Sequence, residues 1–558
     1  MKRRAFLERV SIFGIPIFGV GATAQSAPLA HSSSSNEPQT DAERIRGVVP
    51  VRPEYEPGNV LRYGAERDGV TDDTRAVQDA VNAAATVIIP PGTYLIRNKV
   101  DLRSGVSVVG YGGPTLKTDG TSYIFYGVGR IGSRVALTQD ARIGNTWLSL
   151  SPSHIPAFGQ SDGYALQSDK NPLGHTRHQA GELGLTKSID TNKVQTLTLV
   201  MDDYLVSDNA HAAPVKYLTD IEISGLKFEN TNFDTDPTKR TSQFVYLELV
   251  RGFKISDCVM RKNNSGGIAA FNCLDGLISG NIIGMLGDGS GVLGYGVQLG
   301  FSSQNISVAN NSLFQCRHAV TTGTGSRASK TPNYGVSRGL AIVGNTVSHC
   351  THAGLDTHAD SDGVTITGNT VIGCRIVGIH TRSYRTTISG NTISACSGRG
   401  IRVARSARDT AINGNTVHGI SMHGNFGFGI EADSPSISIS NNRISESASH
   451  GIAVNHNGRY DISINGNVCK NNGKAASGDG INVNAQQKVS GVTITSNHCF
   501  DNQSEPTQRH GLMIEASTIL DKVDCLISAN NLSRSRDKSF QNRSRGSVML
   551  VGNTAGQQ

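Results

Sequence analysis

The sequence predicts an all-β solenoid in which short parallel strands stack coil upon coil, with a helix covering the N-terminal end. The main observation is a repeated phrase: a short alternating strand, Gly-Asn or Asn-Asn, and a second short strand. Successive Asn residues of this phrase lie 22 to 34 residues apart, which is typical of one structural repeat. They are Asn281, Asn311, Asn345, Asn369, Asn391, Asn415, Asn442, Asn467, Asn497, Asn531 and Asn553. Residues at equal offsets from these Asn residues should stack, so the sequence can be read as a surface.

Composition supports the same class. The chain has 64 Gly, one Trp and only 17% charged residues, which suits a turn-rich β protein better than a helical one. Its formal net charge of +7 is compatible with an acidic partner such as an anionic polysaccharide. No basic stretch is interleaved with aromatic residues, so we do not expect nucleic-acid binding.

The first 24 residues have the pattern of an export signal. A basic start precedes the apolar residues 12–20 and the small-residue triplet Ala22-Thr23-Ala24, as in a cleavable signal. Arg3-Arg4-Ala5-Phe6-Leu7 resembles a twin-arginine signal, which implies export of a folded bacterial protein to the periplasm or the exterior. The apolar run is short and contains Pro16, so we expect cleavage and no stable membrane association afterwards. Residues 25–58 are predicted to be a flexible linker.

The nine cysteines are predicted to be free and buried. Cys316, Cys350, Cys374 and Cys396 each follow a repeat Asn by five residues, so they should form a stack inside the coils, where Cys behaves as a small hydrophobe. No pair has the spacing of a zinc finger.

Residues 59–117 differ in character from the repeats. Asp72 or Asp73 can cap a helix predicted over residues 76–85, and the apolar strand 87–89 and a Pro-Pro-Gly turn follow. Such a helix would cover the open end of a solenoid.

The phrases Arg62-Tyr63-Gly64-Ala65, Asp68-Gly69-Val70-Thr71-Asp72-Asp73-Thr74 and Pro90-Pro91-Gly92-Thr93-Tyr94 resemble the opening segment of the pectate-lyase superfamily, which includes rhamnogalacturonase-like and epimerase-like proteins. The resemblance implies a single-stranded right-handed parallel β-helix and a structural role for the Asp-rich phrase. The remaining residues, 118–558, would be β-helix repeats. Within them we expect early coils with long insertions over residues 118–214, a strand at 195–201, and a solvated polar tail over 534–545.

One regular coil shows which side chains face outward. Residues 386–389 and 392–393 form strands around Gly390-Asn391, and residues 400–404 form a third strand. Because side chains alternate along a strand, Ile401 and Val403 should point inward and Arg402 outward. Asn391 should belong to a buried amide ladder.

Aligning the third strand across coils predicts one charged patch. The first outward column holds Gln298, Thr321, Asp356, His380, Arg402, Glu431, Ala453 and Asn482; the second holds Gly300, Gly323, His358, Arg382, Ala404, Asp433, Asn455 and Asn484. Adjacent strands lie about 4.8 Å apart, so the charged members should be neighbours. Arg317 and His318 enter the strand one coil earlier and flank the patch.

Two interpretations of this patch are open. Opposite charges on neighbouring strands stabilise a sheet, which accounts for Arg402 with Glu431. The two histidines are not needed for such a ladder, and they favour a functional site.

The patch contains a candidate general base and guanidinium groups. Removing the proton beside a uronate carboxylate needs a base and positive charge to stabilise the enolate-like intermediate. Loss of the glycosidic oxygen then gives β-elimination, whereas return of a proton to the other face gives C5 epimerisation. We therefore predict an acidic polysaccharide as substrate.

Gly354-Leu355-Asp356-Thr357-His358 resembles the Gly-Phe-Asp-Pro-His phrase of mannuronan C5-epimerases. The resemblance implies that His358 is the base, that Asp356 orients it, and that Arg382 neutralises the substrate carboxylate. Thr357 replaces the Pro, and Ala353 stands where many such epimerases have Tyr. Proton return would fall to His380, Tyr384 or Tyr295, and the missing Tyr makes us rank lyase above epimerase.

Other functions stay open. Glycoside hydrolysis would use Asp356, Glu431 and Asp433 as carboxylates, and a non-catalytic carbohydrate-binding β-helix is the alternative without chemistry. No cofactor is required. Ca²⁺ bound by Asp356, Asp360 and Asp362 is a possibility, although residues 360–363 are better interpreted as a turn. The sequence names neither the sugar nor the oligomeric state.

Overall fold

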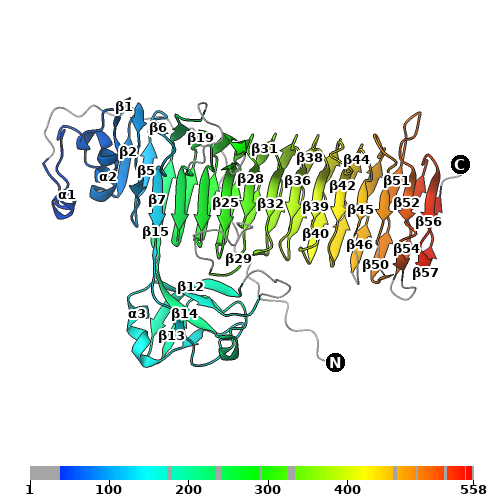
Figure 1. Cartoon of the computed structure of the whole chain (residues 1–558), viewed down its shortest axis with the longest axis horizontal. Coiled ribbons are helices and arrows are strands. Elements are labelled where there is room, and N and C mark those ends of the chain that lie inside the picture. The colour runs from blue at the N-terminus through cyan, green and yellow to red at the C-terminus, as the bar shows by residue number, and fades with distance from the viewer. Residues whose placement is uncertain are drawn as a thin grey trace.

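The protein is an elongated parallel β-helix. The computed structural model describes residues 38–171, 179–233, 242–289, 292–323, 334–455, 461–485, 488–520, 525–546 and 548–555. Three long parallel sheets of 16, 17 and 14 strands run side by side through these residues, and the coils follow one another along the long axis (Figure 1). One apolar core, rich in Ile and Val, fills the interior along this length. The predicted parallel solenoid is confirmed.

A single coil has the predicted three strands. They are β37 (Thr387–Ser389), β38 (Thr392–Ser394) and β39 (Arg399–Val403), and each pairs in parallel with the equivalent strand of the next coil. Ile401 and Val403 are buried, whereas Arg402 is half-exposed. The inward and outward assignment along this strand is therefore confirmed.

A ladder of asparagine amides joins the coils. Asn391 Nδ2 donates to Ile366 O and to Asn415 Oδ1, both at 2.9 Å, and the Oδ1 of Asn391 accepts from Asn369. The ladder continues to Asn553, but its last inner member is Asn530 and not the predicted Asn531. In this coil the left-handed turn residue is Ala529 (φ 54°), so the first Asn of the pair takes the ladder position. The cysteines are free and buried, as predicted.

The N-terminal end carries helix α2 (Thr74–Ala83), which begins and ends two residues earlier than predicted. Asp72 Oδ1 accepts from Thr74 N at 3.1 Å, and Ala84 is already extended, so the helix ends there. Val77, Ala80 and Val81 pack into the solenoid core, and Figure 1 shows the helix at this end of the molecule.

The predicted linker, residues 25–58, contains a helix. Helix α1 (Asp41–Arg46) has a capping box between Thr40 and Glu43, and Glu43 forms a buried ion pair with Arg62 at 2.7 Å. The linker prediction is wrong for the described part of this segment, because a distant ion pair fixes it.

Residues 1–24, the predicted export signal, lie outside the described residues. Within the described ranges, no helix combines the length and apolarity that a membrane crossing requires.

Residues 130–216 contain an antiparallel unit and not the predicted early coils. A separate seven-stranded sheet is formed by β8 (Arg130–Ile131), β9 (Val135–Ala136), β10 (Trp147–Ser149), β11 (Gly163–Gln167), β12 (Gly181–Ile189), β13 (Lys193–Thr196) and β14 (His211–Lys216). Helix α3 (Ile155–Gly159) packs on it, and the unit has its own apolar core. It projects from one side of the solenoid (Figure 1). The strand predicted at 195–201 is β13, which ends at Thr196.

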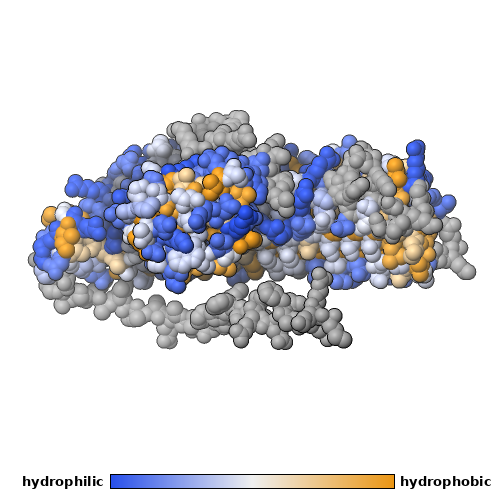
Figure 2. Space-filling model, turned by 90° about the horizontal axis from the view of Figure 1, so that it is seen from below, coloured by the Kyte–Doolittle hydropathy of each residue, from blue (hydrophilic) through white to orange (hydrophobic). Residues whose placement is uncertain are grey.

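The surface seen from the side of this unit is largely hydrophilic. Figure 2 shows small, separate apolar patches over the antiparallel unit and near the C-terminal end. Leu197 and Leu199 are exposed on the unit, and Met549 is exposed at the end.

The predicted solvated tail, residues 534–545, includes β56 (Lys538–Asn542), which pairs with β52 (His510–Ile514). The apolar Phe540 of β56 packs against the core and accounts for this difference.

Candidate active site

The first outward column predicted from the sequence exists on the 14-stranded sheet. Backbone pairing joins its eight members in one continuous row: Gln298, Thr321, Asp356, His380, Arg402, Glu431, Ala453 and Asn482. The strands that carry the charged members are β32 (Ala353–Thr357), β36 (Val377–Thr381), β39 and β42 (Phe428–Ala432). The register prediction is confirmed along its whole length.

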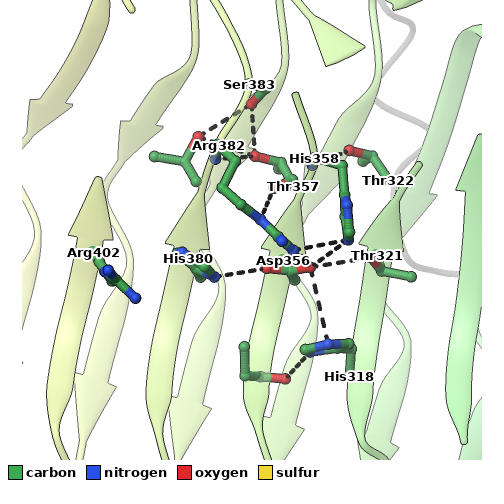
Figure 3. Close-up of polar contacts among 12 residues, drawn as sticks. His318, Thr321, Thr322, Asp356, Thr357, His358, His380, Arg382, Ser383 and Arg402 are labelled. Carbon is green, nitrogen blue, oxygen red and sulfur yellow. Dashed lines mark hydrogen bonds and ion pairs between the residues drawn. The ribbon is translucent and has the colours of Figure 1, made fainter. Parts of the chain in front are cut away.

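Asp356 is the centre of a cluster, shown in Figure 3. Its carboxylate is fully buried. Oδ2 lies 2.5 Å from Arg382 Nη2 and 3.0 Å from His358 Nε2, and Oδ1 lies 2.9 Å from His380 Nδ1. Burial would raise the pKa of Asp356, but hydrogen bonds from His358 and His380 and the charge of Arg382 hold it well below the ordinary value. The carboxylate is therefore ionised and acts as an acceptor.

Thr357 and Thr322 hold the second outward column in place. Arg382 Nε donates to Thr357 O at 3.2 Å, and His358 N donates to Thr322 Oγ1 at 3.2 Å. The buried Thr357 hydroxyl is 2.6 Å from Ser383 Oγ and donates to Thr381 Oγ1 at 3.0 Å. Thr357, which stands at the Pro position of the epimerase phrase, thus ties the Asp356 strand to the next coil.

His358 is positioned as a general base. Its Nε2 lies 2.8 Å from Arg382 Nη2 as well as 3.0 Å from Asp356 Oδ2. Nε2 can donate to Asp356 or accept from Arg382, but it cannot do both. In the tautomer in which Nε2–H donates to Asp356, Nδ1 carries the free lone pair, and within the described chain Nδ1 has no hydrogen-bond partner. The side chain keeps 14% of its surface exposed. In that tautomer the carboxylate orients the ring and leaves the other nitrogen as an acceptor, which is the arrangement that a histidine base requires.

Two further histidines are neutral near pH 7. Burial lowers the pKa of His318 to about 4, against the opposing charge of Asp356, and burial also lowers the pKa of His380. His318 Nδ1 lies 3.2 Å from Ala353 O, and its Nε2 lies 3.9 Å from Asp356. Tyr295 stacks on the His318 ring at 5.2 Å between centroids, so it lies beside the cluster. Tyr384 packs elsewhere, with its backbone bridged to Asp362 and Arg408.

The other predicted residues surround this cluster. Glu431 Oε2 is 2.6 Å from Arg399 Nε and 3.3 Å from Arg402 Nε, while Asp433 lies 3.6 Å from Arg405. Arg317 precedes β28 (His318–Thr322) and raises the positive charge near His318. Gln298 lies two strands from Asp356 in the column. The patch thus divides into the Asp356 cluster and a Glu431 group. In the Glu431 group, an ion pair between neighbouring strands accounts for the presence of Arg402 and Glu431.

Two residues of the site, His352 and Arg399, were not predicted, and Thr321 was placed in the first outward column without a role. Thr321 Oγ1 donates to Asp356 Oδ2 at 3.3 Å, His352 packs edge-on against His318, and Arg399 pairs with Glu431. Arg399 belongs to a third column, two residues before the inward apolar residue of each strand, that also contains Tyr295, His318, Ala353 and Phe428. An alignment of this third column across the coils would have identified Arg399 as a candidate site residue.

Each residue of the third column on β36 and β39 is followed by a glycine, Gly378 or Gly400, and the close approach of the next strand requires it. A Cβ on Gly378 would lie 2.6 Å from Gly400 O, and one on Gly400 would lie 2.6 Å from Gly429 O. These distances are too short for any side chain, so only glycine lets adjacent coils approach this closely.

Two of the three carboxylates of the calcium hypothesis, Asp356 and Asp362, lie on different sheets. Asp356 is engaged on the 14-stranded sheet, whereas Asp362 lies in β33 (Ser361–Asp362) of the 17-stranded sheet and pairs with Arg385. In the part of the chain that the structure describes, no group of three or more His, Cys, Asp or Glu side chains is arranged to hold a metal ion.

Comparison with known families agrees with this architecture. Residues 58–146 match the family described as rhamnogalacturonase A/epimerase, pectate lyase-like. Residues 358–555 match the right-handed beta helix region, and residues 234–448 match the periplasmic copper-binding protein (NosD) family.

Individual relatives are distant. The chain is 24% identical over 239 residues to mannuronan C5-epimerase AlgE2 of Azotobacter vinelandii, covering 38% of this chain and 22% of that protein. It is 21% identical over 246 residues to a capsule K1-specific depolymerase of Klebsiella phage K64-1, covering 41% and 25%. The chain thus spans no more than about a quarter of the curated relatives it matches.

Among solved structures, the Pseudomonas phage phi297 tailspike gp61 is similar, with a TM-score of 0.55, 15% identity, and coverage of 83% of this chain and 82% of that one. Such a likeness shows the fold alone. The family matches and the solved structure together show a right-handed parallel β-helix fold, whose residues 58–146 match a pectate-lyase-like family.

Proposed function

We propose that the protein is an exported enzyme that removes the C5 proton of a uronate residue in an acidic polysaccharide, with β-elimination as the outcome. The observation that carries this proposal is the contact of Asp356 with both His358 and Arg382. It combines an oriented base with a cation at the same edge of the sheet. Relatives that are named as epimerase and depolymerase act on polysaccharides, and the tailspike, adhesin and periplasmic likenesses support export.

Each residue of the cluster has its own role in the proposed reaction. His358 Nδ1 takes the C5 proton, and Asp356 stabilises the imidazolium that forms. Arg382, with Arg317 and Arg402 nearby, stabilises the negative charge that moves onto the substrate carboxylate. Electrons from the C–H bond form the C4–C5 double bond, and the C4–O bond breaks. Tyr295, whose pKa burial raises, keeps its phenolic proton and is the candidate donor to the departing oxygen.

C5 epimerisation is the second candidate function. It shares the first step and ends with proton return to the opposite face of C5. The similarity to the mannuronan C5-epimerase favours it, as does the resemblance of the phrase around Asp356 and His358 to the phrase of that family. Ala353 occupies the position of the expected Tyr, so the structure offers Tyr295 and His380 as the remaining donors.

Glycoside hydrolysis fits the cluster less well. A hydrolase needs one carboxyl group that can give a proton to the glycosidic oxygen. Asp356 is buried and ionised, and the carboxylate of Glu431 is held by two guanidinium groups. Neither is arranged as a general acid.

The test is turnover by the wild type and by His358→Ala on a panel of polyuronates and glycosaminoglycans. Ultraviolet absorbance of an unsaturated product reports elimination, and uptake of deuterium from solvent without absorbance reports epimerisation. We expect His358→Ala to lose about 10²–10⁴-fold in kcat while it still binds the polymer. His418→Ala, on β41 (Thr416–His418) of the 16-stranded sheet, is the matched control and should retain full activity. Unchanged turnover in His358→Ala would contradict the assignment of the base.

A further inference from the structure

A second buried aspartate cluster lies farther along the same sheet. Asp479 is fully buried, and its carboxylate accepts from Arg509 Nε and Nη2 at 2.9 and 2.8 Å. His510 Nδ1 lies 2.8 Å from Oδ1, and Asn482 Nδ2 donates to Oδ2 at 2.8 Å. Asp479, His450 and His510 each stand one Gly before an inward residue, in the same third column as Arg399 and Phe428. Five strand spacings, about 24 Å, separate this cluster from Asp356.

The hydrogen bonds fix which ring nitrogen of each histidine carries the proton. Asp479 N donates to His450 Nδ1 at 3.0 Å, so neutral His450 carries its proton on Nε2. Burial lowers the pKa of His450, against the opposing charge of Asp479, and keeps the ring neutral. His510 donates through Nδ1 to Asp479, which leaves Nε2 as an acceptor. The cluster thus offers one oriented donor and one oriented acceptor, as a pair of sugar hydroxyls requires.

The charge of this second cluster is opposite to that of the first. Arg509 is its cation, and it faces two carboxylates, Asp479 and Glu515, the second at 3.4 Å. Around Asp356 and Glu431, by contrast, Arg317, Arg382, Arg399 and Arg402 outnumber the carboxylates. A uronate is therefore attracted to the Asp356 cluster and repelled by the Asp479 cluster, where uncharged hydroxyl groups can bind.

An aromatic surface lies between the two clusters. Phe428 stacks on His450 at 5.5 Å between centroids and packs edge-on against Phe426 at 5.9 Å. Phe426 is 37% exposed, and the Arg399 guanidinium lies 3.4 Å from its ring centroid. The mutual bonds of His423 and Phe426 close a tight turn that holds Phe426 at the surface. The apolar C–H face of a pyranose ring packs well against such an aromatic ring.

We propose that Phe426, Phe428, His450, Asp479, His510 and Glu515 form a second carbohydrate site, which binds uncharged sugar residues of the same chain whose uronate lies at Asp356. Phe426 stacks on a sugar ring, while His510 Nε2 and Glu515 accept hydroxyl protons and His450 Nε2–H donates. The inference rests on the proposed function, because it places the substrate along the 14-stranded sheet. It narrows the substrate to a heteropolysaccharide that mixes uronates with uncharged sugars.

The test uses the full-length protein and three sets of probes: uronate homo-oligosaccharides, neutral manno-, gluco- and galacto-oligosaccharides, and oligosaccharides in which uronates alternate with neutral hexosamines. Histidine ¹⁵N resonances report where each probe binds. We expect at least one neutral set to shift His450 and His510 but not His358. The mixed oligosaccharides should shift all three histidines. Neutral and mixed probes that leave His450 and His510 unmoved would overturn the inference.

Two variants test the contacts. Phe426→Ala and Glu515→Gln should each weaken the affinity for the mixed probe about 2- to 10-fold, with the affinity for uronate homo-oligosaccharides unchanged. Phe314→Ala, which has an Arg261 guanidinium over its ring on another sheet, and Glu222→Gln, paired with Lys254, are the matched controls. Equal affinities in variants and controls would contradict the second site.

The outcome separates the two proposals. Neutral-probe binding is measured without turnover, so it can succeed even if no uronate is ever cleaved or epimerised. The converse outcome is turnover that depends on His358 and is the same in Phe426→Ala as in the wild type. That outcome would support the proposed function and contradict only the second site.

Discussion

Asp356 shows how one buried carboxylate can organise several functional groups. It accepts from Arg382 and Thr321 and lies within 3.0 Å of ring nitrogens of His358 and His380. Arg382 Nη2 also contacts His358, so the cation and the base share one anchor. An uncompensated carboxylate at this depth would be costly, and the surrounding donors remove that cost. The geometry of the base therefore depends on the charge of Asp356 as well as on its hydrogen bonds.

Replacing Asp356 by Asn should remove the charge with little change in volume. The amide no longer stabilises the His358 imidazolium and can favour the wrong tautomer, so we expect kcat to fall about 10²–10⁴-fold. Steady-state kinetics on the active polyuronate measures the loss, and circular dichroism checks the fold. Asp275→Asn, at an exposed ion pair with Arg251, is the control. Equal kcat values for Asp356→Asn and the wild type would show that the carboxylate does not support the base.

At the scale of elements, regular coils were predictable and the irregular parts were not. The 14-stranded sheet followed from a simple alternation, because Ile379 and Ile401 had to be inside and His380 and Arg402 outside. The antiparallel unit has no repeat, and its hydrogen bonds join strands such as β11 and β14 that lie far apart in sequence. Helix α1 depends on the distant contact of Glu43 with Arg62. The Asp479 cluster was missed because its histidines lie one Gly before the inward residue, outside the two columns that alternation suggested.

The antiparallel unit contains a carboxyl group that makes its stability depend on pH. Burial raises the pKa of Glu182, in β12, to about 7, with Arg338 opposing the shift and Asp202 adding to it. Because the folded pKa is raised above the unfolded value of 4.5, the stability contribution is fully present below pH 4.5 and is lost as pH rises through 7. The loss amounts to about 3 kcal/mol.

Hydrogen exchange of the amides in β11, β12 and β14, corrected for intrinsic rates between pH 5 and 8, should reveal this loss. Glu182→Gln keeps an acceptor for Met201 N and Tyr204 OH but cannot ionise, so its protection should not change over that range. Identical pH profiles for the variant and the wild type would show that Glu182 does not control the stability of the unit.

On the scale of the whole molecule, charge varies along the solenoid. Guanidinium groups predominate on the coils around Asp356, while carboxylates predominate around Asp479. The positive field around Asp356 attracts a polyanion, and this attraction weakens as the salt concentration rises. In the proposed complex, the uronate lies on the coils around Asp356 and the uncharged residues lie on the coils around Asp479.

Binding of a polyuronate should weaken as salt rises. Between about 0.01 M and about 0.15 M ionic strength the Debye length shortens from about 30 Å to about 8 Å, so KM should rise severalfold with kcat unchanged. Arg402→Gln should make the dependence shallower, while Arg443→Gln, on β44 (Arg443–Ser445) of the 16-stranded sheet, should not. A KM that is independent of salt would argue against electrostatic recognition of the polymer.

The parallel register has a consequence for how this protein can change. Each coil adds one strand to the 14-stranded sheet, so the separation of Asp356 from Asp479 is a whole number of strand spacings, each about 4.8 Å. Inserting or deleting one coil between them would move the second cluster by one such step and leave both clusters intact. The distance between the two clusters can therefore change only in steps of one strand spacing. By gaining or losing single coils, related proteins could match sugar chains of different repeat length.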